Sequence, residues 1–292
     1  MIRRKYTSID KYIITIWVYI LLHSMVHAQG MEDAKWWMGI KAGANFTRVS
    51  ASNSYSVFEY YSTPTQDTKK QYGSFFKNAG PSLGFIVTHS ITPTIAISIQ
   101  PAYQSYHFTY TNKFSWRDTL KNENTLENSV RTKLHYVELP LLFRYEYSFG
   151  KLQPYLQAGA YYGYMLNGKK TTTMEEKMKD LGGEVSLVKS VEDFNVNQLY
   201  IHSQYGFIGG VGVSVDLNYF RLSLECNYRH GLNNITDRKN RLEQQRMING
   251  TYDVPDDIKL QNLEFSLQCA TPLDFLIHTP GMSGKAGKVR RR

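Results

Sequence analysis

The segment HYVELPLLFRYEY, residues 135–147, alternates between two kinds of side chain. One parity holds the apolar and aromatic residues Val137, Leu139, Leu141, Phe143, Tyr145 and Tyr147. The other parity holds Glu138, Pro140, Arg144 and Glu146, with Leu142 as the exception. Because successive side chains of a strand point to opposite faces, this strand has one apolar and one charged face. The apolar face either covers a protein core or turns outward to lipid.

Seven further segments alternate in the same way: 37–47, 80–89, 94–110, 152–166, 203–217, 219–231 and 259–270. Apart from Lys259 at the very start of the last segment, the apolar row carries no charge in the eight segments. The opposite row holds Lys41, Glu138, Arg144, Glu146, Asp216, Arg221, Glu225, Arg229 and Glu264. A soluble barrel would show these charges to water. The clean apolar row, with glycines mostly on the polar side, instead predicts an all-β, eight-stranded antiparallel up-and-down transmembrane β-barrel with a polar interior.

The connections between these segments alternate between long and short. We predict long ones at about 48–79, 111–132, 167–202 and 232–258, and short ones at about 90–93, 148–151 and 217–219. Long external and short periplasmic connections are typical of outer-membrane barrels. The loops 48–79 and 167–202 are rich in Tyr and Lys, so we expect them to be the ligand or partner surfaces. Part of 173–181 is expected to form a short helix.

The two ends of the chain are unlike its middle. Arg3, Arg4 and Lys5 precede an apolar run at 12–22, and small residues end at Ala28. This pattern predicts a signal peptide at 1–28, cleaved after Ala28. The barrel is expected at 29–275, with Phe275 as its terminal aromatic residue. A basic, disordered tail is expected at 276–292, for which a neutral extension and a contact with an anionic periplasmic partner are both open.

The net charge of +9 lies almost wholly at the two ends of the chain. Residues 1–28 contribute +3 and residues 285–292 contribute +5, which leaves +1 for the rest. The basic balance therefore gives no evidence for a nucleic-acid partner. Two cysteines, Cys226 and Cys269, both fall on the apolar row, where small hydrophobic residues fit.

The charged row offers two interpretations. It forms either a network of ion pairs that neutralises buried charge, or an ion path with a perturbed acid. The best catalytic candidates are Ser105 and His107, two residues apart on the outward face near the external interface, where a lipid-modifying enzyme would need a nucleophile and a base. No orienting carboxylate is evident.

Metal and cofactor sites are not expected. His107, His135, His202 and His230 fall near loop-side strand ends but on different faces, so we do not expect them to converge. The glycine-rich run 206–213 lies in an alternating strand with no following helix, which excludes a dinucleotide-binding loop.

Three stretches of the sequence resemble one family. They are GIKAGANFT (39–47), YVELPLLFRYEY (136–147) with LQPYLQAGAYYGYML (152–166), and FIGGVGVSV (207–215) with FRLSLECNYRHGLNNI (220–235). They are similar to the PorT-like outer-membrane β-barrels of Bacteroidota. The resemblance implies an eight-stranded barrel in the outer membrane, and at least one relative takes part in protein secretion and gliding machinery.

We therefore expect a small outer-membrane barrel without catalysis, with a structural or interaction role carried by its external loops. The alternatives are a subunit of an envelope secretion complex and a lipid-modifying outer-membrane enzyme. The expected partners are outer-membrane lipid and, as further candidates, envelope proteins.

Overall fold

The structure is a computed structural model that describes residues 35–55, 70–117, 123–179, 185–217, 220–243, 251 and 253–273. The predicted signal peptide, Phe275 and the basic tail 276–292 lie outside these residues. Within the described part, no helix is long and apolar enough to cross a membrane.

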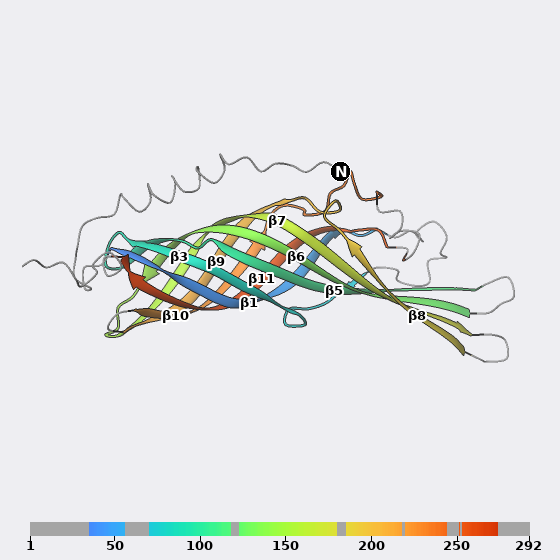
Figure 1. Cartoon of the computed structure of the whole chain (residues 1–292), viewed down its shortest axis with the longest axis horizontal. Helices are drawn as coiled ribbons and strands as arrows, with labels where there is room; N and C mark the ends of the chain where they lie inside the picture. The colour runs from blue at the N-terminus through green and yellow to red at the C-terminus, as the bar shows by residue number, and fades with distance from the viewer. Residues whose placement is uncertain are drawn as a thin grey trace, which may run out of the picture.

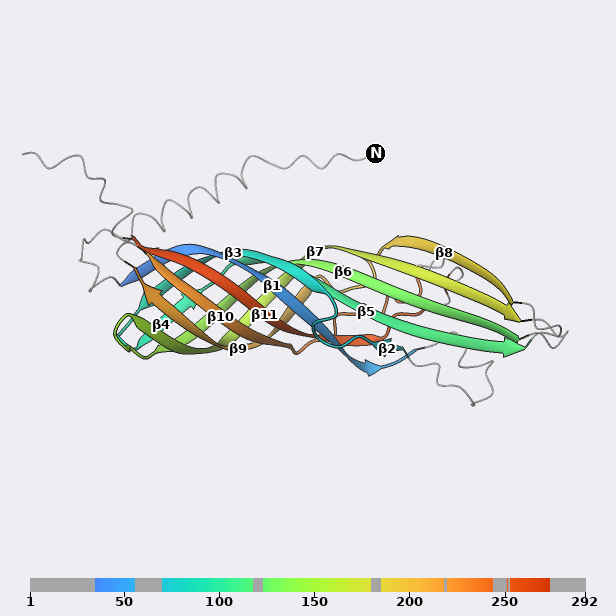
Figure 2. The ribbon, with the colours of Figure 1, turned by 90° about the horizontal axis from the view of Figure 1, so that it is seen from below.

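Strands make up most of the described chain (Figures 1 and 2). They are β1 (Trp36–Asn53), β2 (Gln71–Tyr72), β3 (Ala79–Ser90), β4 (Ile95–Ile99), β5 (Ala102–Arg117), β6 (Glu123–Glu146), β7 (Leu152–Lys179), β8 (Val185–Asn195), β9 (Ser203–Asp216), β10 (Arg221–Gly231) and β11 (Asp257–Pro272). All belong to one sheet. The sheet closes because β1 pairs antiparallel with β3 on one side and with β11 on the other.

The closed ring has eight positions. The strands β4 and β5 share one of them, one following the other along the barrel wall. Its order is β1, β3, β4 with β5, β6, β7, β9, β10 and β11, while β2 and β8 attach to β5 and β7 outside the ring. The predicted eight-stranded antiparallel up-and-down barrel is therefore confirmed.

The strand predicted at 94–110 is interrupted at Gln100 and Pro101. Pro101 has no N–H to donate to a ladder. Its carbonyl still accepts from the Phe85 N–H at 2.9 Å, and the Gln100 N–H donates to the Pro140 carbonyl at 3.2 Å. The proline thus breaks the strand without opening the barrel wall.

At one end, here called the extended end, the strands run further than the alternation predicts. The predicted loop 111–132 is mostly a ladder between β5 and β6 that continues to Arg117 opposite Glu123. The predicted loop 167–202 contains the end of β7 and all of β8. The expected helix within 173–181 is wrong, because β7 stays a strand through Lys179. These stretches lack a clean apolar row, so the sequence pattern resembles a loop.

The other end, here called the short-turn end, has tight connections, as predicted. Ile91 N–H donates to the Ile95 carbonyl at 2.9 Å, and Leu217 N–H donates to the Phe220 carbonyl at 2.9 Å. Between β6 and β7, Phe149 and Leu152 form an isolated bridge. The alternation of short and long connections follows from this up-and-down order.

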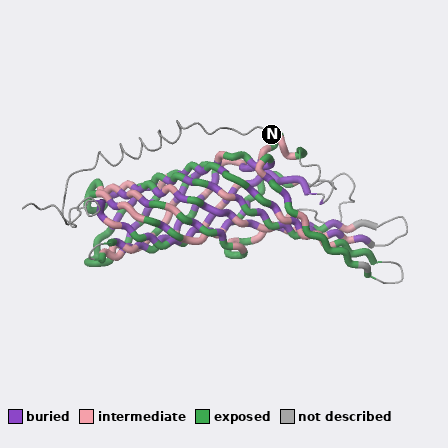
Figure 3. The backbone as a smooth tube through the Cα atoms, viewed as in Figure 1, coloured by how far each residue is buried: buried purple, intermediate pink, exposed green. Residues whose placement is uncertain are grey.

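Buried and exposed residues alternate along the strands of the barrel (Figure 3). The apolar row is the exposed one and faces outward, and the charged row is the buried one and faces inward. Leu224 is 57% exposed and Phe265 41%, whereas Arg221 and Glu225 are 8% and 1% exposed. A soluble barrel would show the reverse. Leu142, the exception on the charged row, is fully buried in a small lumen cluster with Tyr161 and Ile208.

Cys226 and Cys269 are both free. In the register between β10 and β11, Cys226 lies opposite Phe265 and Cys269 lies opposite Leu222. The two thiols are therefore at different heights along the barrel, and they serve as small hydrophobic residues of the outward row.

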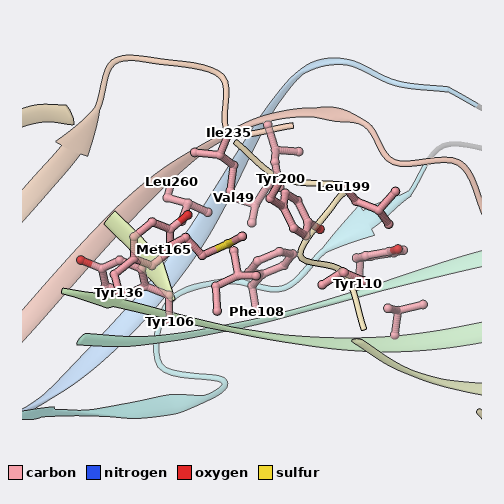
Figure 4. Packing of buried hydrophobic residues seen from close by; sticks show 14 of the residues in the cluster. Val49, Tyr106, Phe108, Tyr110, Tyr136, Met165, Leu199, Tyr200, Ile235 and Leu260 are labelled. Atoms are coloured by element: carbon pink, nitrogen blue, oxygen red, sulfur yellow. The ribbon is translucent and has the colours of Figure 1, made fainter. Parts of the chain in front are cut away.

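At the extended end the interior also holds a hydrophobic cluster (Figure 4). Fifteen buried residues form this cluster: Val49, Tyr106, Phe108, Tyr110, Val130, Leu134, Tyr136, Met165, Phe194, Val196, Leu199, Tyr200, Ile235, Ile258 and Leu260. They come from the barrel wall, from the end of β8 and from the segments after β8 and β10. Beyond the outward apolar belt, the protein therefore buries a hydrophobic core as a soluble domain does.

A β-bulge interrupts the alternation of β7 beside this cluster. His135 lies opposite Asn167 and Tyr136 opposite Met165, so Leu166 is the extra residue. Leu166 and Asn167 both face outward, and the inward parity then shifts to even-numbered residues such as Lys170. A bulge of this kind re-aims the side chains that follow it.

Candidate functional site

The nine charged residues predicted for the interior lie in the lumen and form one continuous chain of ion pairs. From the extended toward the short-turn end its order is Glu138, Arg229, Glu264, Lys41, Glu225, Arg144, Glu146, Arg221 and Asp216. The signs alternate along the whole chain. Each of the four cations therefore lies between two carboxylates, which offsets the cost of burying it.

The ion pairs nearer the extended end are fully closed to solvent. Arg229 Nε lies 3.3 Å from Glu138 Oε2, and Arg229 Nη2 donates to Glu264 Oε2 at 2.7 Å. Lys41 Nζ lies 3.0 Å from Glu264 Oε2 and 3.8 Å from Glu225 Oε2. Glu264 thus holds two cations from two other strands, β10 and β1.

The remaining ion pairs reach the short-turn end. Arg144 Nη2 donates to Glu225 Oε1 at 2.8 Å, and Arg144 Nη1 lies 3.5 Å from Glu146 Oε1. Arg221 Nη1 donates to Glu146 Oε2 at 3.3 Å. Arg221 also forms a fork with Asp216 through Nε at 2.6 Å and Nη2 at 3.0 Å. Its guanidinium lies over the Trp37 ring, 4.2 Å from the centroid.

The chain of charges ends in a cavity of about 620 Å³ at the short-turn end. Its charged and aromatic lining includes Lys35, Trp37, Glu146, Lys151, Asp216 and Arg221. Positive and negative side chains both face this cavity, so it favours neither a cationic nor an anionic ligand.

A second charged cluster, absent from the sequence prediction, lies at the extended end. Asp253 pairs with Lys170 and with Lys70, whose Nζ lies 3.1 Å away. Asp256 pairs with Lys70 at 3.0 Å and accepts a hydrogen bond from Tyr72 at 2.8 Å. The cluster ties the segment before β11 to β7. Its one sequence signal is the acidic pair Asp256 and Asp257 next to Asp253, but the bulge hides the inward position of Lys170.

The pKa values in this cluster follow from burial and charge. Burial alone would raise the pKa of the Asp253 carboxyl, but the ammonium groups of Lys170 and Lys70 outweigh burial and hold that pKa below its ordinary value. Burial raises the pKa of Tyr72 far above its ordinary value, and Asp256 adds to this effect. Tyr72 is therefore a neutral hydrogen-bond donor, and Asp253 is an anion.

The structure brings Ser105 and His107 together and adds His135. Ser105 Oγ lies 3.0 Å from His107 Nε2 and 3.1 Å from His135 Nδ1. The hydroxyl of Tyr103 lies 2.6 Å from the same His135 nitrogen. The expectation that the histidines do not converge is therefore wrong for this pair. His202 is exposed and contacts the Tyr164 ring instead.

This cluster lacks two features of a hydrolase site. Ser105 is only 1% exposed, although its parity is outward. The ring of His107 hydrogen-bonds the Ala79 backbone, and no hydrogen bond or ion pair joins it to a carboxylate within the described part. A base of this kind lacks the charged partner that stabilises an imidazolium.

Metal ligands do not gather in the described residues: no group of three or more His, Cys, Asp or Glu has a suitable arrangement. The glycine-rich run 206–213 is part of β9, as the alternation predicts. It therefore offers no phosphate-binding turn.

Beyond the ring, β8 continues the sheet at the extended end. It pairs with β7 along its whole length, from Lys169 opposite Asn195 to Lys179 opposite Val185. Among the described strands it has no second neighbour, so one edge is free. This hairpin exposes Met178, Val185, Leu187, Val188 and Val191.

A family model described as an outer membrane protein beta-barrel domain matches residues 27–237. No curated protein gave a significant match to the chain. Several solved structures are similar in fold.

Ail, the attachment invasion locus protein of Yersinia pestis, in complex with the heparin analogue sucrose octasulfate, is 9% identical, with 81% of this chain and 99% of that chain covered and a TM-score of 0.27. Neisserial surface protein A is 12% identical, with 81% and 97% covered and a TM-score of 0.30. The outer membrane protease OmpT from Escherichia coli is 10% identical, with 84% and 97% covered and a TM-score of 0.29.

Proposed function

Because the chain belongs to the outer membrane protein beta-barrel domain family and so resides in the outer membrane, we propose that it is a non-catalytic barrel whose extended end binds another protein. Short connections of outer-membrane barrels lie in the periplasm and long ones outside the cell. The extended end with its β7–β8 hairpin then faces outward. The partner surface is a paired β-hairpin, where the sequence pattern predicted a long loop at 167–202.

The observation that carries this proposal is the apolar free edge of β8. Val191 is 62% exposed and Leu187 is 58% exposed, although both lie beyond the lipid-facing belt. Exposed apolar patches in water mark interaction sites. An unpaired strand edge also offers backbone N–H and C=O groups to an added strand from a partner.

The lumen has a structural role in this proposal. Eight strands enclose a space that side chains fill, so an open pore is excluded. The alternating chain of charges neutralises itself within the barrel, which favours the ion-pair network over an ion path.

We also propose the kind of partner and the site at which the signal peptide is cleaved. The resemblance to PorT-like barrels of Bacteroidota supports the alternative that the partner is a component of an envelope secretion complex. Removal of residues 1–28 is part of the same proposal, and it predicts that the mature protein begins at Gln29. N-terminal sequencing of protein from purified outer membranes tests the cleavage site.

The experiment on the partner surface uses a photo-crosslinking amino acid in intact cells. At Val188, on β8, we expect crosslinks to a discrete protein. The matched control is Leu139, which is similarly exposed but lies in the lipid-facing belt, where we expect no protein crosslink. Crosslinks of equal yield at both positions, or none at any β8 position in a correctly assembled barrel, would contradict the proposal.

One observation favours the lipid-modifying alternative, namely the contact between Ser105 and His107 at 3.0 Å. The burial of Ser105 and the missing carboxylate argue against it. Incubation of the purified full-length protein with phospholipid and lipid A tests this alternative. Release of fatty acid that is abolished in Ser105→Ala would establish an enzyme, and we expect none.

A further inference from the structure

A basic patch lies on the outer surface of the barrel where the apolar belt ends on β5, β6 and β7. Lys133 on β6 is directly opposite His107 on β5 and Lys169 on β7. One row further from the belt, Arg131 lies opposite Thr171. Because neighbouring strands are about 4.8 Å apart, these side chains of three strands are close neighbours.

Within the residues that the structure describes, the charges of this patch are not balanced. Lys169 pairs with Asp193 at 2.8 Å. Arg131 and Lys133 are exposed, and within the described part of the chain neither forms an ion pair or a side-chain hydrogen bond. Three cations therefore face one carboxylate. Like charges directly opposite each other on paired strands are destabilising, so an anion between Lys133 and Lys169 would relieve a cost that the fold itself leaves in place.

The surface below the patch is graded from polar to apolar. The next row toward the belt places Ser105 opposite His135, and their side chains are 3.1 Å apart. The row after that places Tyr103 opposite Val137, and both are exposed on the outward face. Cationic groups, hydrogen-bonding groups and apolar groups thus follow one another down the same strands.

We propose that this surface binds a lipid of the outer leaflet whose headgroup carries a phosphate. Arg131 and Lys133 hold the phosphate, because a guanidinium binds phosphate oxygens through two parallel N–H groups and an ammonium adds a compact charge. His135 contacts the headgroup below it. The acyl chains lie along Tyr103 and Val137. The order of groups on the lipid, phosphate first and hydrocarbon second, matches their order on the barrel.

The site is separate from the free edge of β8, and neither proposal depends on the other. The patch lies on the outward face of the ring at the end of the belt, whereas Val188 and Val191 lie on the hairpin beyond it. If the wild-type protein gave the crosslink at β8 but did not bind the lipid, the result would contradict only the proposed lipid site.

The test measures binding of diphosphoryl lipid A, and of the same lipid with both phosphates removed, to the full-length protein in dodecyl maltoside micelles. We expect wild type to prefer the phosphorylated lipid by about tenfold or more, as charge-assisted hydrogen bonds imply. The Arg131→Gln/Lys133→Gln variant should lose this preference. Both positions are exposed, so the barrel should assemble, and its resistance to unfolding in detergent checks this.

The matched control is Lys259→Gln on β11, which stands four positions around the ring from β6. This variant should keep the preference of wild type. Retention of the preference in the double variant, or its absence in wild type, would overturn the proposal. Full competition by inorganic phosphate at millimolar concentration would also overturn it, because the ligand would then be a free anion whose acyl chains contribute nothing.

Discussion

Arg229 donates to Glu264 across 2.7 Å in the lumen, and neither side chain is exposed. The same carboxylate lies 3.0 Å from Lys41. Glu264 is therefore the anion that separates two buried cations, one from β10 and one from β1. It connects strands that are neighbours of β11 on opposite sides, so the wall on both sides of β11 depends on it.

Replacement of Glu264 by Gln should therefore lower the free energy of unfolding by about 3–5 kcal/mol, since it leaves two buried cations without their shared partner. Urea unfolding in lipid vesicles, followed by tryptophan fluorescence, measures this change. Lys259→Gln, which removes a charge at the rim of the same strand, should change stability by less than about 0.5 kcal/mol. A loss below about 1 kcal/mol in Glu264→Gln would show that the network is not needed for stability.

A charged substitution on the outward row should lower the free energy of unfolding only where that row faces lipid. Leu224 lies opposite Leu267 and Val213 on the outward face. Leu224→Lys should cost about 2–4 kcal/mol, as expected near a bilayer midplane. Leu187→Lys, at an equally exposed position on β8 beyond the belt, should cost less than about 0.5 kcal/mol. The same unfolding assay compares them, and equal costs would mean that the belt does not contact lipid.

The barrel wall could be predicted from the sequence because its two rows differ so strongly. Every segment with a clean apolar row became a strand of the ring, and Lys41, Glu225 and Glu264 all face the lumen as parity requires. In these segments lipid on one side and a narrow lumen on the other impose one rule on every residue.

The alternation of apolar and polar residues did not predict the strands beyond the belt. There the outside is water, so the outward faces of β5, β6 and β7 carry residues such as Lys133 and Thr171 and read as loops. The extra residue Leu166 then shifts the parity of β7. Lys170, which fell in a predicted loop, therefore turns inward, although the parity of 152–166 continued without a break would point it outward. The convergence of His107 and His135 depends on the register between β5 and β6, which a single strand pattern does not contain.

The salt bridges at the extended end should make it sensitive to acid. The pKa of Asp253 is lower in the folded protein than in the unfolded chain, despite its burial, because Lys170 and Lys70 hold the anion. Its ion pairs therefore contribute full stability above the unfolded pKa of about 3.9, and the contribution is lost as the pH falls below that value. Limited proteolysis from pH 7 to pH 3 with an acid-active protease should show cleavage near 251–256 rising below about pH 4.

The variant Asp253→Asn removes the titrating group. Its cleavage near 251–256 should already be raised at neutral pH, and it should change little between pH 7 and pH 3. Asp193→Asn is the matched control, because Asp193 pairs with Lys169 on the exposed surface and should leave the pH profile of wild type unchanged. A profile in Asp253→Asn identical to that of wild type would assign the acid sensitivity to another group.

The short-turn end offers a test of shape against charge. Arg221 lies over the Trp37 ring at 4.2 Å and forms a two-pronged contact with Asp216. Arg221→Lys keeps the charge but loses the planar fork and the stacking, so we expect a loss of about 1–2 kcal/mol in the free energy of unfolding and a shift in tryptophan emission.

Lys151→Gln, in the lining of the same cavity, is the control for charge, and it should leave both stability and emission unchanged. Arg221→Met extends the comparison, because it removes the charge and leaves Asp216 and Glu146 without their shared cation. It should lose more stability than Arg221→Lys. Arg221→Lys could instead be as stable as wild type while Arg221→Met loses much stability. The positive charge alone would then stabilise the short-turn end, and the stacking on Trp37 would contribute nothing.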